Sequence, residues 1–174
     1  YRTELRFDVQ RRSHDYTPPT EPGHPGPDPA RPERTIGGAD RFLDALVTRI
    51  LPEAERHLPD APFRRCLWGH SLAGLCALYC LLTRPRAFDR YIAVSPSLWW
   101  ADAFMLRLQR QRLVSSGDGQ GAAQCPVMLG DSERRSSPAG PHWDGPAPHT
   151  LRFAETLDAA GGVPTRLTVF AGLG

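Results

Sequence analysis

Hydrophobic residues along the chain fall into short runs that alternate with segments rich in proline, glycine and charged residues. A short continuous apolar run predicts a buried strand, whereas apolar residues three and four apart predict a helix that packs by one face. We therefore expect strands at residues 64–68, 91–94, 126–129 and 166–170. Helices are expected at residues 39–58, 71–82, 102–114 and 150–160, the first with a kink or break at Pro52.

The remaining segments lack such periodicity. Residues 1–17 are expected to be irregular or to form a short strand. Residues 18–36 hold many prolines, with Gly23 and Gly26 among them, and predict a surface loop because this composition does not build a packed element. Residues 115–124 and 132–148 are also expected to be loops.

Alternating strands and helices define the expected fold class. This order is typical of an α/β protein with a mostly parallel sheet and helices on both faces. The 174 residues are enough for one domain with a sizeable core, and no internal repeat is present. We expect a single domain over residues 1–174.

Composition and charge exclude several classes of function. The formal net charge is only +2, without a basic patch for nucleic acid, and no apolar run approaches the roughly 18 residues of a membrane span. All 21 basic residues are arginines, which we interpret as the coding bias of a GC-rich genome. The four cysteines show neither a Cys-x-x-Cys pair nor zinc spacing, and Cys76 and Cys80 are expected to be small core residues.

One motif carries chemistry: Gly69-His70-Ser71-Leu72-Ala73-Gly74 lies where a predicted strand turns into a buried helix. This is the setting of a nucleophile elbow, in which a sharp turn exposes the serine oxygen and small flanking residues let strand and helix approach. The N–H of Leu72, at the helix start, would stabilise an oxyanion. Ala73 replaces the usual second glycine, and we expect alanine, the next smallest residue, to be tolerated there with slightly tighter packing. The alternative is that Ser71 merely caps the helix.

The residues around this motif resemble the siderophore esterases, α/β-hydrolases that open the trilactone of ferric enterobactin and its relatives. The resemblance continues through Leu81-Leu82-Thr83-Arg84-Pro85 to Ser95-Pro96-Ser97-Leu98-Trp99-Trp100. It implies an α/β-hydrolase fold and a serine esterase that forms an acyl-enzyme on Ser71. No metal or other cofactor is expected in the chemistry, because iron arrives with the substrate.

An acid and a histidine should complete the machinery, in the chain order serine, acid, histidine. Asp131 lies closer to the end of strand 126–129, whereas the resemblance favours Glu133; both could instead be solvated loop carboxylates. None of the six histidines follows the last predicted strand. The resemblance implies a base just after Gly174 and a second oxyanion donor before Tyr1. We therefore expect a fragment, incomplete at both ends and inactive alone.

Four further residues are candidates for substrate binding. Trp99 and Trp100 follow a strand end and could stack on catechol rings, or could simply pack. Arg11 and Arg12 could attract an anionic ferric catecholate, or could be solvated. The expected partner is a small-molecule ester such as a ferric siderophore, and neither nucleic acid nor a membrane is expected as a partner. The protein is expected in the periplasm or cytoplasm of a bacterium. The alternatives are a general carboxylesterase or thioester hydrolase, and a remnant without catalysis.

Overall fold

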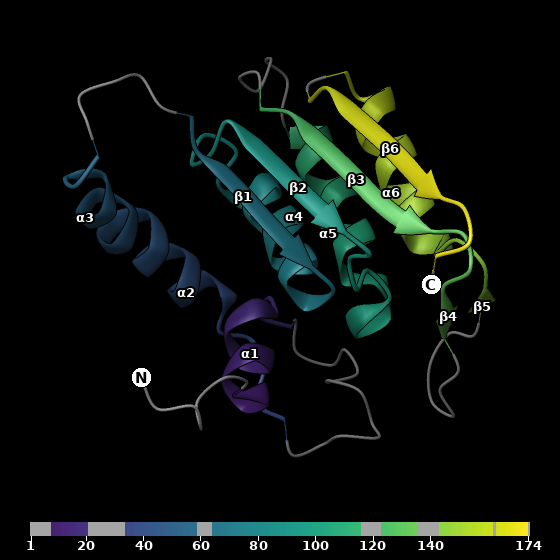
Figure 1. Cartoon of the computed structure of the whole chain (residues 1–174), viewed down its shortest axis with the longest axis horizontal. Coiled ribbons are helices and arrows are strands. Elements are labelled where there is room, and N and C mark those ends of the chain that lie inside the picture. Colours follow the sequence, from purple (N-terminus) through teal and green to yellow (C-terminus); the bar gives the residue numbers. More distant parts are fainter. Residues whose placement is uncertain are drawn as a thin grey trace.

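A computed structural model describes residues 8–20, 34–58, 64–115, 123–135, 143–161 and 163–173. Its main sheet is parallel, with strand order β1-β2-β3-β6 (Figure 1). The strands are β1 (Cys66–His70), β2 (Arg90–Val94), β3 (Cys125–Gly130) and β6 (Thr165–Phe170). All four predicted strands are confirmed, although β1 begins and ends two residues later than expected. The fold is that of an α/β protein with a parallel sheet.

Three helices cover one face of this sheet: α4 (Leu72–Thr83), α5 (Trp100–Ser115) and α6 (Pro148–Ala159) (Figure 1). The parallel register aligns Tyr91, Ala93 and Val127 on that face, where all three are buried. On the opposite face Trp68 is 61% exposed and Phe170 is 43% exposed. Among the described residues, helices therefore cover one face of the sheet, whereas the sequence predicted helices on both faces.

A long helical segment precedes β1. It consists of α2 (Ala39–Ala45), the π-helical turn η2 (Leu46–Ile50) and α3 (Leu51–Glu55). The sequence predicted a kink or a break at Pro52; no break occurs, since helical structure continues from α2 through η2 into α3. Proline has no N–H to donate to the carbonyl of Thr48, four residues earlier, and the wider π-turn around Thr48 accommodates this loss.

The first element corrects a prediction. Residues expected to be irregular or a strand form helix α1 (Val9–Tyr16). The Asp8 carboxylate caps this helix by accepting the N–H of Arg11 at 2.9 Å. Ser13 is buried, and the carbonyl of His14 accepts the N–H of Gly38 at 2.8 Å. Packing against α2 and α4 therefore stabilises a helix whose sequence carries almost no apolar stripe.

The predicted loops contain a little regular structure. Residues 18–20 and 34–36 are irregular, as expected, and residues 21–33 lie outside the described part. In the segment after β3, the two-residue strands β4 (Arg134–Arg135) and β5 (Trp143–Asp144) pair antiparallel. None of the described helices is long and apolar enough to cross a membrane. Cys76 and Cys80 are buried in α4, which confirms their predicted place in the core.

Candidate active site at the carboxyl end of the sheet

Ser71 alone makes the turn between β1 and α4. Its backbone has φ 59° and ψ −121°, in a region that side chains rarely adopt. The Ser71 N–H donates to the carbonyl of Val94, and its carbonyl accepts the N–H of Leu75, both at 3.0 Å. Its side chain makes no capping hydrogen bond, so the alternative of a helix cap is not what the structure shows. The strained turn points the hydroxyl away from the helix it begins.

Two glycines make this turn possible. A Cβ on Gly69 would lie 2.1 Å from the carbonyl oxygen of Ala73, so strand and helix approach too closely for any side chain there. A Cβ on Gly74 would lie 3.1–3.2 Å from Gly69 and Pro96, which is tight but less severe. The atoms closest to position 69 are backbone atoms of Ala73 and Gly74, and the methyl group of Ala73 is not among them. An alanine at position 73 is therefore compatible with the elbow. This agrees with the expectation that alanine is tolerated there.

Leu72 begins α4 and lies beside Ser71. The first N–H groups of a helix have no acceptor within the helix, and the positive end of the helix dipole lies there. The Leu72 N–H is thus suited to a developing negative charge next to the nucleophile. Its role as an oxyanion donor stays a prediction.

A second serine contacts Ser71. The Oγ of Ser97 lies 3.3 Å from the Oγ of Ser71, and the N–H of Ser97 donates to the Ser71 carbonyl at 3.2 Å. Ser97 is only 5% exposed. The sequence analysis missed this residue, although its place just after a parallel strand, in the repeat Ser95-Pro96-Ser97, was an available signal.

The two candidate acids contact different segments. Glu133 Oε1 accepts the hydroxyl of Ser95 at 2.5 Å and the N–H of Gly130 at 3.1 Å. Ser95 has a positive φ of 40°, so the backbone of this loop is strained. The hydrogen bond from the Ser95 hydroxyl to Glu133 holds the loop, which also carries Ser97, in place. Asp131 Oδ1 instead accepts the N–H of Gly172, after β6, at 2.7 Å. Glu133 is thus linked to the surroundings of Ser71, and Asp131 to the turn at the sheet edge.

No base reaches Ser71 within the described residues. The hydrogen-bond partner of its hydroxyl there is Ser97, and the His70 side chain is exposed. The ring of His149 in α6 lies 6.0 Å from that of Trp143, between centroids. His24 and His142 lie outside the described part. No cluster of three potential metal ligands occurs among the described residues.

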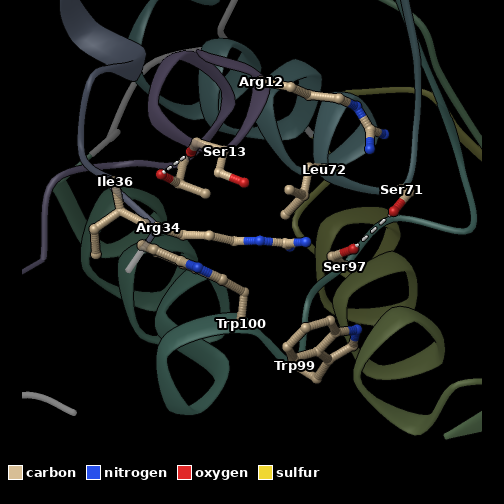
Figure 2. A pocket seen from close by; sticks show the side chains of 10 residues that line it. Arg12, Ser13, Arg34, Ile36, Ser71, Leu72, Ser97, Trp99 and Trp100 are labelled. Carbon is tan, nitrogen blue, oxygen red and sulfur yellow. Dashed lines mark hydrogen bonds between the residues drawn. The ribbon is translucent and has the colours of Figure 1, made fainter. Parts of the chain in front are cut away.

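A pocket of about 170 Å³ opens beside Ser71 (Figure 2). Its lining comes from four segments: α1, the residues before α2, the elbow, and the loop after β2. It includes residues that the sequence analysis did not select, among them Arg34 and Ile36. The segments are far apart in sequence, which explains why residue patterns could not assemble this lining.

The structure separates the four predicted substrate-binding residues. Arg12 lines the pocket and donates to the His70 carbonyl at 3.5 Å. Arg11 points elsewhere, into a second hollow with Asp8 and Asp15. Both tryptophans line the pocket, but Trp99 is half-buried, whereas Trp100 is only 3% exposed and packs edge-on against Phe104, 6.2 Å between ring centroids. Arg12 and Trp99 are therefore better placed for a ligand than Arg11 and Trp100.

A strained serine at a strand-to-helix turn, at the carboxyl end of a parallel sheet and facing a pocket, defines the nucleophile elbow of the α/β-hydrolases. Comparison with known families agrees: the model of the Esterase family matches residues 22–139. The chain belongs to this family of esterases.

Its relatives with established names are siderophore esterases. The chain is 44% identical over 95 residues to the siderophore triacetylfusarinine C esterase of Aspergillus fumigatus, covering 54% of this chain and 30% of that protein. It is 37% identical over 132 residues to the siderophore enterobactin esterase of Emericella nidulans, covering 74% and 43%. These similarities confirm the family resemblance that the motifs indicated.

Solved structures agree in fold. The enterobactin and salmochelin hydrolase IroE superposes with a TM-score of 0.68 at 28% identity, covering 100% of this chain and 60% of its own. The siderophore hydrolase EstB from Aspergillus nidulans gives 0.71 at 26% identity, covering 95% and 59%. The chain thus spans about 60% of these structures and 30–43% of the two curated relatives.

Proposed function

We propose that Ser71 is the nucleophile of a serine esterase that cleaves ester bonds of a catecholate siderophore through an acyl-enzyme. The observation that carries this proposal is the backbone of Ser71, whose positive φ presents the hydroxyl to a pocket beside the start of α4. Evolution retains such strain where the surrounding structure and the function require it. The named relatives support a siderophore as the substrate.

The residues around Ser71 suggest how the reaction proceeds. Ser71 Oγ attacks the ester carbonyl, its proton passes to a base, and the alcohol leaves while the acyl group stays on Ser71. The Leu72 N–H faces the oxyanion. Ser97 holds the attacking hydroxyl in one rotamer. Glu133 is the preferred acid, since its bond to Ser95 joins it to this loop, and Asp131 is the alternative. Water then hydrolyses the acyl-enzyme.

The first experiment tests the nucleophile. We would express both residues 1–174 and the complete open reading frame, and treat each with a fluorophosphonate probe. For the complete protein the proposal expects label on Ser71, and loss of label and of ester hydrolysis by orders of magnitude in Ser71→Ala; residues 1–174 alone are expected to be inactive. Ser132→Ala removes an exposed serine at the same sheet edge and should retain both. Equal labelling of Ser71→Ala and the parent would exclude Ser71.

The second experiment separates the substrates. Enterobactin and triacetylfusarinine C are compared with a simple p-nitrophenyl ester and an acyl-thioester. Faster turnover of a siderophore supports the proposal, whereas equal or faster turnover of the simple esters supports a general carboxylesterase or thioester hydrolase. Absence of labelling and turnover in the complete protein would support a remnant without catalysis.

A further inference from the structure

One short loop, residues 95–97, contacts both groups that the proposed reaction needs. The loop begins where β2 ends, and its first residue, Ser95, donates a hydrogen bond to Glu133. Its last residue, Ser97, contacts the hydroxyl of Ser71, as Figure 2 shows. The contact to the preferred acid and the contact to the proposed nucleophile are therefore made by the same few residues.

The backbone of Ser95 is held in an unfavourable conformation from both of its ends. Its φ of 40° is positive, which disfavours a side chain. Its N–H donates to the Met128 carbonyl of β3 at 2.7 Å, and the next residue, Pro96, is buried and lies close to Gly74 in the first turn of α4. Glycine adopts a positive φ without strain, so the turn itself does not require the serine side chain.

The Ser95 hydroxyl occupies one oxygen of the Glu133 carboxylate. Oε1 accepts this hydroxyl at 2.5 Å and the N–H of Gly130 at 3.1 Å. A hydroxyl that donates to a carboxylate typically lies about 2.5–2.7 Å away, and such bonds are about twice as strong as neutral ones. Among the described residues, Oε2 accepts no hydrogen bond. Each carboxylate oxygen has lone pairs for donors of its own, so Oε2 is left for another group.

Neutral donors, rather than a cation, orient this carboxylate. Arg134, the next residue along the chain, pairs with Asp144 at 3.2 Å instead of with Glu133. The Glu133 side chain is half-buried at the carboxyl end of the sheet. Its position therefore depends on the two bonds to Oε1, and the bond from Ser95 is the shorter of them.

We propose that Ser95 is a positioning residue, whose hydroxyl anchors Oε1 of Glu133 and leaves Oε2 to accept the N–H of the base that activates Ser71. The acid of a serine hydrolase orients the base and stabilises its charged form, which requires a fixed carboxylate. Without the Ser95 hydroxyl, Oε1 keeps the longer bond to Gly130, and the side chain gains access to other rotamers. Ser95 is not among the residues that line the pocket, so it acts through Glu133. This role rests on the proposed function.

A double-mutant cycle in the complete open reading frame measures this role. Steady-state turnover of a p-nitrophenyl ester by the parent, Ser95→Ala, Glu133→Gln and the double variant gives the coupling between the two side chains. Ser95→Gly also lacks the hydroxyl but relieves the positive φ, so it separates the loss of the hydrogen bond from backbone strain. Thermal unfolding verifies that each variant is folded.

The chain offers a matched control cycle. The Ser132 hydroxyl donates to Oδ1 of Asp131 at 2.8 Å, so it forms the same kind of bond near the end of the same strand. Ser132→Ala, Asp131→Asn and their double variant are measured alongside the first cycle. Ser132→Ala alone should retain the turnover of the parent, because its carboxylate partner is not the preferred acid.

We expect Ser95→Ala to lower kcat by about 10–100-fold, the size of one hydrogen bond to a charged group. KM should stay within about twofold of the parent, because Ser95 lies outside the pocket lining. Ser95→Gly should lose as much turnover as Ser95→Ala, although it unfolds at a higher temperature. In the Glu133→Gln background, Ser95→Ala should cost less than about twofold.

Three results would overturn the positioning role. The first is a full loss of turnover on Ser95→Ala in the Glu133→Gln background, because the hydroxyl would then act without Glu133. The second is parental turnover in Ser95→Gly, because strain rather than the hydrogen bond would then explain Ser95→Ala. The third is equal coupling in the control cycle of Ser132 and Asp131.

These results are distinguishable from a failure of the proposed function. If Ser71→Ala abolishes turnover but Ser95 and Glu133 show no coupling, the positioning role is wrong and the esterase stands. If the complete protein shows no turnover that depends on Ser71, the esterase proposal is wrong, and the positioning role is wrong with it.

Discussion

Gly69 is the residue whose substitution by alanine should be most damaging to the elbow. The new Cβ would lie 2.1 Å from the oxygen and 2.3 Å from the carbon of the Ala73 carbonyl, and 2.7 Å from the nitrogen of Gly74. All three are backbone atoms, so no flexible side chain can move aside. Relief requires α4 to retreat from β1, and the Ser71 bonds to Val94 and Leu75 oppose that movement.

The expected destabilisation follows from these contacts. Overpacking costs about 1–3 kcal/mol, and each of two weakened backbone hydrogen bonds adds about 0.5–1.5 kcal/mol. We take about 4 kcal/mol as the central value, a large part of the roughly 5–15 kcal/mol that stabilises a domain. With a urea m-value of about 2 kcal/mol/M, the unfolding midpoint of Gly69→Ala should fall by about 2 M.

Gly74→Ala is the matched control. Its Cβ meets neighbours at 3.1–3.2 Å, a contact that a few tenths of an ångström relieve. Alanine also gains about 0.5–1 kcal/mol over glycine within a helix, so the two effects nearly cancel. Urea unfolding followed by circular dichroism compares both variants with the parent. Equal midpoints for Gly69→Ala and Gly74→Ala would refute the reasoning that backbone contact at Gly69 shapes the elbow.

Four further predictions concern the site and the core. In the complete protein, Glu133→Gln should lower the turnover rate more than Asp131→Asn does, because Glu133, and not Asp131, holds the loop beside Ser71. Equal or reversed losses of turnover in a steady-state assay would show that Glu133 is not the acid. Ser97→Ala should slow fluorophosphonate labelling of Ser71 while Thr83→Val, a lost hydroxyl at the far end of α4, leaves the labelling rate unchanged; identical rates in all three proteins would exclude a role for Ser97. At pH 8, iodoacetamide followed by mass spectrometry should modify the exposed Cys66 first, and modification of a buried thiol at the same rate would contradict this. Burial raises the pKa of the other thiols, to about 12 for Cys76, about 11 for Cys80 and about 12 for Cys125. Because these raised values favour the protonated folded state, the free energy of unfolding should decline as the pH rises above the ordinary thiol pKa of 9.0.

The sequence predicted those parts of the fold whose signal is local. Strands β2 and β3 and the buried helix α4 are apolar over most of their length, so their burial and their order along the chain could be inferred directly. Helix α1 could not, because its residues are mostly polar and its stability comes from the Asp8 cap and from packing against α2 and α4. Propensity and pattern fail where tertiary contacts decide.

The same distinction holds at the site. Ser71 and Leu72 could be predicted because an elbow is a continuous stretch of residues with a strand before it and a helix after it. Arg34 could not be placed beside Ser71, since it comes from a proline-rich segment. Ser97 had one available signal, its place in the loop after a parallel strand, but this signal does not show which residue of the loop meets Ser71. Arg11 and Arg12 are adjacent in sequence, and only helical geometry shows that they face different hollows.

The backbone of Ser71 places folding and function in opposition at a single residue. A conformation of this kind disfavours a side chain by about 1–3 kcal/mol, and glycine is free of that penalty. A glycine at position 71 would therefore relax the turn and raise the stability of the domain while removing the only oxygen that the turn exists to display. Selection for stability alone would favour replacement of the serine, so a serine in this unfavourable geometry is what the proposed role of Ser71 as nucleophile requires.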